Sequence, residues 1–234
     1  MNNLVLTRAQ FIEAALNGTL PSIENYEHII IYDDIVLSGD FPSEINIEKY
    51  LFEGGFCADN AHFRKPVLGA SVHFEKGFSI NGATFDDICC FDDAIFRKDF
   101  IGSNATFKQD FSAKNACFEK RFIGKDTTFE HLFDIEGSRC LSDFNVNFGV
   151  FEDSFLATSA KFYKGMYLVD ASLNESFSAD HAEFKDFIHA QGTKFRDYFF
   201  ISGSTINKVF VSDEKTARYI ELAKQNIYIR FVQL

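Results

Sequence analysis

Apolar side chains recur at every eleventh residue along most of this chain, in two registers four residues apart. Within residues 104–125, Phe107 and Phe111 are followed eleven residues later by Phe118 and Phe122. The first register comprises Phe41, Phe52, Phe63, Phe74, Phe85, Phe96, Phe107, Phe118, Phe129, Cys140, Phe151, Phe162, Leu173, Phe184, Phe195 and Ile206. The second comprises Ile45, Phe56, Val67, Phe78, Cys89, Phe100, Phe111, Phe122, Phe133, Phe144, Phe155, Met166, Phe177, Ile188, Phe199 and Phe210. A fixed period held over this length predicts a solenoid.

Phenylalanine dominates both registers and is expected to form the core. The chain has 234 residues with 30 Phe and no Trp, and the two registers hold 24 of those phenylalanines. Burial of each ring contributes roughly 1.5–3 kcal/mol, so the stacked rings are the main stabilising interaction. The residues predicted to lie at the centre of the core are Phe63, Phe74, Phe85, Phe96, Phe107, Phe111, Phe118, Phe122, Phe129 and Phe133.

The residues just before each first-register ring indicate how the chain turns. A small residue stands two places before the ring, as at Ala105 and Ala116, and a turn-forming residue precedes it. These turn formers are Gly82, Asp93, Asn104, Asn115, Asp126, Gly137, Asp170, Gly192 and Gly203. Strand side chains alternate, so the small residue and its ring share one inward face. The second ring, four places on, must point inward from another face, across a corner.

This pattern resembles that of the pentapeptide-repeat proteins, in their Phe-centred variety. The resemblance covers roughly residues 39–211, although the period here is eleven, which corresponds to alternating faces of five and six residues. It implies an all-β fold, namely a right-handed quadrilateral parallel β-helix with about 22 residues per coil and just under eight coils.

The two ends of the chain do not keep the repeat and are expected to cap the rod. Residues 1–38 form an acidic cap, in which Thr7 and Gln10 fit a capping box before a short helix that Gly18 ends. Branched residues at 28–32 and 35–37 then predict strands. Residues 212–234 predict a carboxyl-terminal helix, which either plugs the rod or forms a homodimer with a second copy.

The net charge of −11 argues against direct nucleic-acid binding, which requires basic side chains on phosphates. Ten of the acids and only two basic residues lie in residues 1–60. The sequence contains no apolar run long enough to cross a membrane, and its first residues do not resemble a signal peptide. The five cysteines have no metal-ligand spacing, which favours a reduced, cytoplasmic protein. No membrane partner is expected, because no apolar run is long enough to cross a bilayer.

No motif for catalysis, a metal or a cofactor is recognisable, so the chain is expected not to be an enzyme. Its six histidines are scattered, and Cys89 and Cys90 fit structural positions. Phosphate-binding glycine loops and nucleophile elbows do not occur in the sequence.

Positions on the outside of the rod become informative when they are grouped by coil. One edge carries Lys76, Lys98, Lys120, Ser142, Lys164, Asp186 and Lys208. The opposite edge becomes acidic towards the carboxyl end, with Asp153, Glu175 and Asp197. Tyr163, Tyr167, Phe187 and His189 are expected to gather on one side of the later coils. The charged edges are explained either by solubility alone or by contact with different partners. The aromatic residues are either covered by the terminal segment after Ser212 or exposed, and exposed aromatic residues that lie together are typical of interfaces.

Two functions follow from these observations. The first is a non-catalytic, rigid scaffold that binds a protein partner through these outer residues. The second comes from the resemblance, because some pentapeptide-repeat proteins protect or inhibit DNA gyrase by presenting a DNA-like acidic rod, dimerised through a carboxyl-terminal helix. The acidic total favours this DNA mimic, whereas the row of lysines argues against it.

Overall fold

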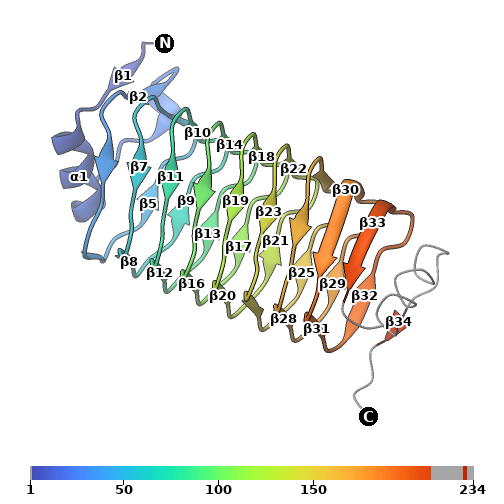
Figure 1. Ribbon diagram of the computed structural model, residues 1–234. Coiled ribbons are helices and arrows are strands. Elements are labelled where there is room, and N and C mark those ends of the chain that lie inside the picture. The colour runs from blue at the N-terminus through green and yellow to red at the C-terminus, as the bar shows by residue number, and fades with distance from the viewer. Residues whose placement is uncertain (1, 212–228, 231–234) are drawn as a thin grey trace.

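The computed structural model describes residues 2–211 and 229–230, and it shows a rod built from stacked coils (Figure 1). The chain makes about 9 turns of about 22 residues each. Strands pair in parallel with their equivalents in the next coil, as Phe74 does with Phe96 and Phe96 with Phe118. The prediction of an all-β parallel solenoid with this coil length is therefore confirmed.

Four strands in each coil give the rod four faces, numbered I to IV in chain order. Face I is an eight-stranded sheet of β4 (Asp40–Phe41), β8 (His62–Phe63), β12 (Thr84–Phe85), β16 (Thr106–Phe107), β20 (Thr128–Phe129), β24 (Val150–Phe151), β28 (Ser172–Leu173) and β31 (Lys194–Phe195). Face II is a nine-stranded sheet of β5 (Ile45–Asn46), β9 (Val67–Leu68), β13 (Cys89–Cys90), β17 (Phe111–Ser112), β21 (Phe133–Asp134), β25 (Phe155–Leu156), β29 (Phe177–Ser178), β32 (Tyr198–Phe200) and β34 (Ile229–Arg230). Among the described strands, only β34 is antiparallel to its neighbour.

Faces III and IV belong to one larger sheet. Face III contains β2 (Ile29–Ile31), β6 (Tyr50–Phe52), β10 (His73–Phe74), β14 (Ile95–Phe96), β18 (Cys117–Phe118), β22 (Arg139–Cys140) and β26 (Lys161–Phe162). Face IV contains β3 (Ile35–Val36), β7 (Phe56–Cys57), β11 (Phe78–Ser79), β15 (Phe100–Ile101), β19 (Phe122–Ile123), β23 (Phe144–Asn145) and β27 (Met166–Tyr167). In the last two coils, β30 (Glu183–Ala190) and β33 (Thr205–Val211) run through both faces without a break.

The phenylalanine rings fill the inside of the rod. Rings on one face stack in parallel from coil to coil, as in Phe107 over Phe129, with centroids 5.1 Å apart and planes 2° apart. Rings of neighbouring registers meet edge to face, as Phe107 meets Phe111 at 4.9 Å and 69°. All ten rings predicted for the centre of the core are buried, with 0–3% of each exposed. Both ring geometries are the favourable ones for aromatic pairs.

One corner residue in every eleven adopts the left-handed backbone conformation. Positive φ angles recur from Lys49 to Gly203 at intervals of eleven residues, and they include every turn-forming residue predicted from the sequence. The corner therefore requires this conformation whatever residue the sequence supplies. Phe148 illustrates this requirement, because it has φ 60° although a bulky side chain disfavours it.

We expect Phe148→Asn to stabilise the protein. Phe148 is 49% exposed, so little packing is lost, and asparagine tolerates the left-handed region far better. The gain should be about 0.5–1 kcal/mol, which raises the melting temperature by roughly 1–4 °C for a chain of this size. Ile88→Asn is the control, since Ile88 is 42% exposed and does not have a positive φ. Equal melting temperatures for the two variants would contradict this account.

A helix closes the amino-terminal end of the rod, at the left of Figure 1. After β1 (Leu4–Val5), α1 (Arg8–Asn17) begins at a capping box between Thr7 and Gln10 and ends at Gly18, and a short 3-10 turn (Ile23–Asn25) follows. Phe11 of α1 is fully buried and lies edge-on to Phe52, with centroids 5.6 Å apart. The helix thus covers rings that would otherwise face water.

The stacked sheet begins earlier than residue 39. Strands β2 and β3 pair with β6 and β7, but this coil is one residue shorter than the later ones, as the pairing of Ile35 with Phe56 shows. Because one residue is missing, the apolar residues of this coil do not fall in the eleven-residue registers, and the predicted number of coils is too low. At the other end, the predicted helix in residues 212–234 lies outside the described residues, apart from the strand at 229–230.

Candidate partner-binding surface

Four aromatic side chains gather on the outside of face IV in the last coils, and we call them the aromatic cluster. They are Tyr167, Phe187, His189 and Phe210. The ring of Phe187 lies edge-on to Tyr167 at 5.3 Å and to Phe210 at 5.6 Å. His189 lies 6.2 Å from Tyr167 and 5.9 Å from Phe210. Phe210 is 50% exposed and the other three are half-buried, so the cluster presents apolar surface to the exterior.

The straightened strands β30 and β33 create this cluster. Their pairing slips by one residue between Phe184 and Phe187, so that His189 pairs with Phe210 and Ile188 with Val209. The second-register prediction that Phe210 points inward is therefore wrong. The last coil is one residue short at this corner, so Val209 stands in register with the buried Ile188 and Phe210 is turned outward.

Two neighbouring residues shape the edge of the cluster. A side chain at Gly165 would lie 2.6 Å from the ring of Phe187 and 2.8 Å from that of Tyr167, so glycine makes room for both rings. Tyr163 stands beside the corner between faces III and IV, where Lys185 Nζ lies 4.0 Å from its ring centroid. Partial burial raises the pKa of the Tyr167 hydroxyl. Tyr163 was predicted to join the cluster, whereas Gly165 and Phe210 were not.

The predicted acidic edge lies on a different part of the rod from the cluster. Asp153, Glu175 and Asp197 occupy the same position of successive coils, at the corner between faces I and II. Asp153 accepts a hydrogen bond from the backbone N–H of Ser154 at 2.5 Å, and Glu175 is exposed. The structure therefore separates these acids from the aromatic cluster, and the two sets form distinct surfaces.

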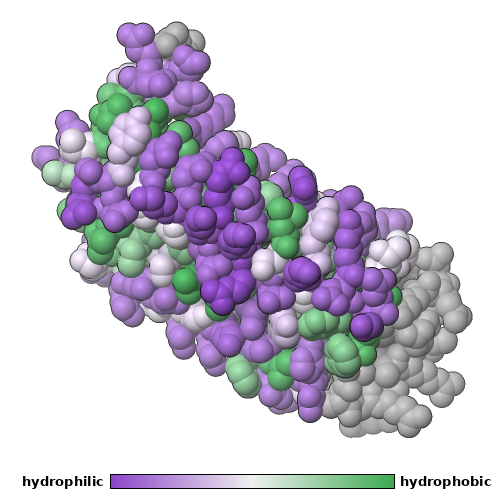
Figure 2. Space-filling model, turned by 45° about the horizontal axis from the view of Figure 1, so that its top comes forward, coloured by the Kyte–Doolittle hydropathy of each residue, from purple (hydrophilic) through white to green (hydrophobic). Residues whose placement is uncertain are grey.

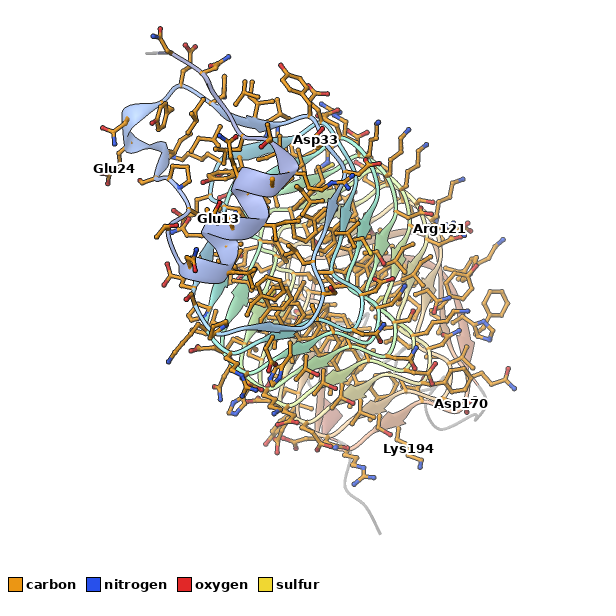
Figure 3. The ribbon with its side chains drawn as sticks, turned by 90° about the vertical axis from the view of Figure 1, so that its left-hand side faces the viewer. Glu13, Glu24, Asp33, Arg121, Asp170 and Lys194 are labelled. Carbon is orange, nitrogen blue, oxygen red and sulfur yellow. The ribbon has the colours of Figure 1, made fainter. Side chains whose placement is uncertain are left out.

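The corner between faces III and IV carries the predicted lysine row. Lys76, Lys98, Lys120, Lys164 and Lys208, which we call the basic corner, are all exposed. Arg121 shares this corner. In Figure 3, which looks at the rod from its amino-terminal end, Arg121, Asp170 and Lys194 point outward at different places around the coil. The cluster lies at the carboxyl-terminal end of the basic corner, since Phe187 and Lys208 are paired residues of β30 and β33.

Arginines of the same corner are already paired with acids. Arg97 Nε lies 2.9 Å from Glu75 Oε1, and its Nη1 lies 2.6 Å from Glu119 Oε1. Arg121 Nη2 lies 2.5 Å from Asp99 Oδ2, and this hydrogen bond holds the pKa of Asp99 below its ordinary value. None of the five lysines of the basic corner forms an ion pair within residues 2–211.

A row of alternating charges on face I ties four coils together. His62 lies between two carboxylates, 3.0 Å from Asp40 and 2.7 Å from Asp86. Asp86 also pairs with Lys108 at 2.9 Å, and hydrogen bonds from Lys108 and then His62 lower the pKa of Asp86. These ion pairs link each of the four coils to the next.

The enclosed gap found among the described residues inside the coils is too small for a ligand. The gap among the rings of Phe56, Phe78 and Phe91 has a volume of about 10 Å³, which is room for at most one water molecule. A larger hollow of about 540 Å³ lies outside, between the loop after α1 and the first corners, where Pro21, Pro42 and Pro66 line it. Most of the exterior in view in Figure 2 is hydrophilic, with small apolar patches.

The described part of the chain contains no group of three or more His, Cys, Asp or Glu placed to hold a metal ion. None of the helices within the described residues is long and apolar enough to cross a membrane. The chain matches no family model, and comparison with curated proteins and with solved structures finds no match either. Any function must therefore be argued from this chain's own surface.

Proposed function

We propose that this chain is a non-catalytic, rigid solenoid of pentapeptide-like repeats whose exterior binds a protein partner. The aromatic cluster is the observation that carries the proposal. Almost all other phenylalanine rings of the described residues lie inside the rod, whereas Tyr167, Phe187, His189 and Phe210 lie together outside it. Grouped aromatic side chains with one apolar face and partial exposure are typical of binding hot spots. The rod holds them at fixed positions, which lowers the entropy cost of binding.

A paired-variant capture experiment tests this function. The tagged full-length protein and the Phe187→Ala/Phe210→Ala variant are used to capture partners, and each candidate is then purified and its affinity measured directly. We expect the double variant to bind the partner at least about tenfold more weakly, because it loses two aromatic contacts. Tyr32→Ala is the matched control, since Tyr32 is 60% exposed on the amino-terminal part of the rod. Unchanged affinity of the double variant would reject the cluster as the binding site.

A DNA mimic that acts on DNA gyrase is the second candidate. It is favoured by the acids Asp153, Glu175 and Asp197, which repeat at one-coil intervals, and by the net charge of −11. Dimerisation through residues 212–234 belongs to this candidate and stays a prediction. A supercoiling assay with the purified protein tests it directly. Inhibition or protection that disappears in Asp153→Asn/Glu175→Gln/Asp197→Asn would support the mimic, and no effect at high protein concentration would eliminate it.

The cellular compartment is part of the proposal as well. All five cysteines are free thiols, and burial raises the pKa of the Cys90 and Cys117 thiols. Free thiols of this kind fit a reducing compartment. We therefore place the protein in the cytoplasm.

A further inference from the structure

Within residues 2–211, the lysines of the basic corner form no ion pairs, although the protein as a whole is acidic. Lys76, Lys98 and Lys120 occupy successive coils, and Lys164 follows beyond Ser142. Asp186 takes the next place in the row, and Lys208 of the last coil pairs with Phe187. Successive coils of a parallel sheet are about 4.8 Å apart, so Lys76, Lys98 and Lys120 form a continuous positive edge, which Ser142 and Asp186 interrupt farther along the rod. On a chain with a net charge of −11, a row with lysine at five of its seven positions is not the mixed distribution that solubility alone requires.

Three of the acids beside the lysines are bound by arginines. Glu75 and Glu119 both bind Arg97, and Asp99 binds Arg121. These pairs are internal to the corner, and their three carboxylates against two guanidinium groups leave a net charge of −1. Asp143 and Asp186 also lie at this corner, but the five lysines outnumber the acids that remain, so the corner from Lys76 to Lys208 keeps a net positive charge for an anionic partner.

We infer that the basic corner and the aromatic cluster together bind an acidic polypeptide segment that ends in apolar side chains. Its carboxylates would lie along Lys98, Lys120 and Lys164, and its apolar end would pack on Phe187 and Phe210. The inference rests on the proposed function, and it adds the chemistry of the partner. Charge complementarity gives the segment its direction along the rod, because the lysine row leads into the aromatic cluster at one end only.

A polypeptide fits this surface better than a nucleic acid does. A duplex would extend past the corner and meet the acidic amino-terminal part, where residues 1–60 carry ten acids and two basic residues. A short acidic segment touches the basic corner alone. The apolar side chains at its end would also pack on the aromatic cluster, whereas the phosphates of a nucleic acid would leave that cluster exposed.

Fluorescence anisotropy with labelled peptides tests the inference on the full chain. The probes are octaglutamate followed by two phenylalanines, octaglutamate alone, octalysine followed by two phenylalanines, and a short DNA duplex. The variants are Lys98→Gln/Lys120→Gln and Phe187→Ala/Phe210→Ala. Lys65→Gln/Lys194→Gln is the matched control, because it removes the same charge from two exposed lysines outside the basic corner.

We expect the acidic peptide with phenylalanines to bind, and its affinity to fall as salt rises. Lys98→Gln/Lys120→Gln should weaken it about tenfold, while the control changes it by less than about twofold. Removing the phenylalanines from the peptide should lower its affinity about tenfold, and so should Phe187→Ala/Phe210→Ala in the protein.

Other results would overturn the inference. Equal binding of the basic peptide, or tighter binding of the DNA duplex through the same lysines, would show that the corner does not select an acidic polypeptide. Concentration-dependent self-association that Lys98→Gln/Lys120→Gln abolishes would assign the corner to a second copy instead. Absence of peptide binding, with partner capture still lost in Phe187→Ala/Phe210→Ala, would reject the acidic segment but leave the proposed function intact.

Discussion

Phe118→Ala is expected to lower the free energy of unfolding by about 3–5 kcal/mol, because it leaves a ring-sized cavity at the centre of the rod. Phe118 is 1% exposed and stacks on Phe96, with centroids 5.1 Å apart and planes 4° apart. It also meets Phe122 edge to face at 5.2 Å and 87°. Its other neighbour along face III is Cys140, so no ring on that side can move in to fill the space.

Thermal and chemical unfolding measure this loss directly. The melting temperature should fall by roughly 6–20 °C, given about 2–4 °C per kcal/mol for a chain of this length. Phe148→Ala is the control, since the same side chain is removed from a position that is 49% exposed, and its effect should be small. A melting temperature within about a degree of wild type would show that Phe118 does not stack inside the rod.

The fold could be predicted because the same physical requirement repeats in every unit. Each coil buries one large apolar side chain per face, usually a ring, and each eleven residues contain one left-handed corner, so both signals appear directly in the sequence. Glycine, asparagine and aspartate at corners such as Gly82 and Asn104 showed where the chain turns. Phe148 could not be predicted as left-handed from residue preference, because the neighbouring coils impose the conformation on it.

The failures come from coils that lack one residue. Such a coil keeps its hydrogen bonds but shifts the alternation of side chains by one position. At the amino-terminal end, this shift placed β2 and β3 outside the eleven-residue registers. At the other end, it put Val209, rather than Phe210, in register with the buried Ile188. Sequence alone does not indicate at which corner the residue is missing.

One compensation inside the core was also invisible in the sequence. Cys89 stands where the second register has a ring, and Phe91, two residues later on the same inward side, lies 5.4 Å from Phe78 and 5.7 Å from Phe96. A side chain at Gly69 would be 2.7 Å from the Phe91 ring, so the glycine of the preceding coil makes room for it. Gly69 and Phe91 both lie outside the two registers, so the period of eleven did not point to them.

The aromatic cluster was partly predictable from the sequence. Tyr167 and His189 pair across neighbouring coils, and Gly165 and Phe187 are related in the same way, so the coil length placed these side chains together. The pairing of Arg97 and Arg121 with acids depends on side-chain conformation, and it decides which cations of the basic corner stay available. The period predicts where side chains stand, and the contacts determine which of them can act.

Ala116→Asp is expected to destabilise the protein by about 4 kcal/mol at pH 7 through its charge alone, because a buried carboxylate loses its hydration and the loss accumulates only from the unfolded pKa of about 3.9 up to pH 7. Ala116 is fully buried beneath the rings, in a column with Ala94 and Ala160. Burial there raises the carboxyl pKa by roughly 3–5 units, at about 1.36 kcal/mol per unit. The folded pKa then lies above the unfolded one, so the folded protein holds the proton more tightly. Stability relative to wild type is therefore lost as pH rises above about 4, and it is partly restored as pH falls.

Ala116→Asn separates the effect of charge from the effect of side-chain volume, because asparagine has the shape of aspartate but no ionisable group. It should cost less at pH 7, and its loss should not change between pH 5 and pH 7, as urea unfolding at the two values would show. Ala116→Ser gives a further comparison, because Ser138 occupies the same column and is fully buried, and about 1–2 kcal/mol is expected. A pH dependence shared by the aspartate and asparagine variants would mean that the position is hydrated, and that the column of small residues does not face the ring-filled interior.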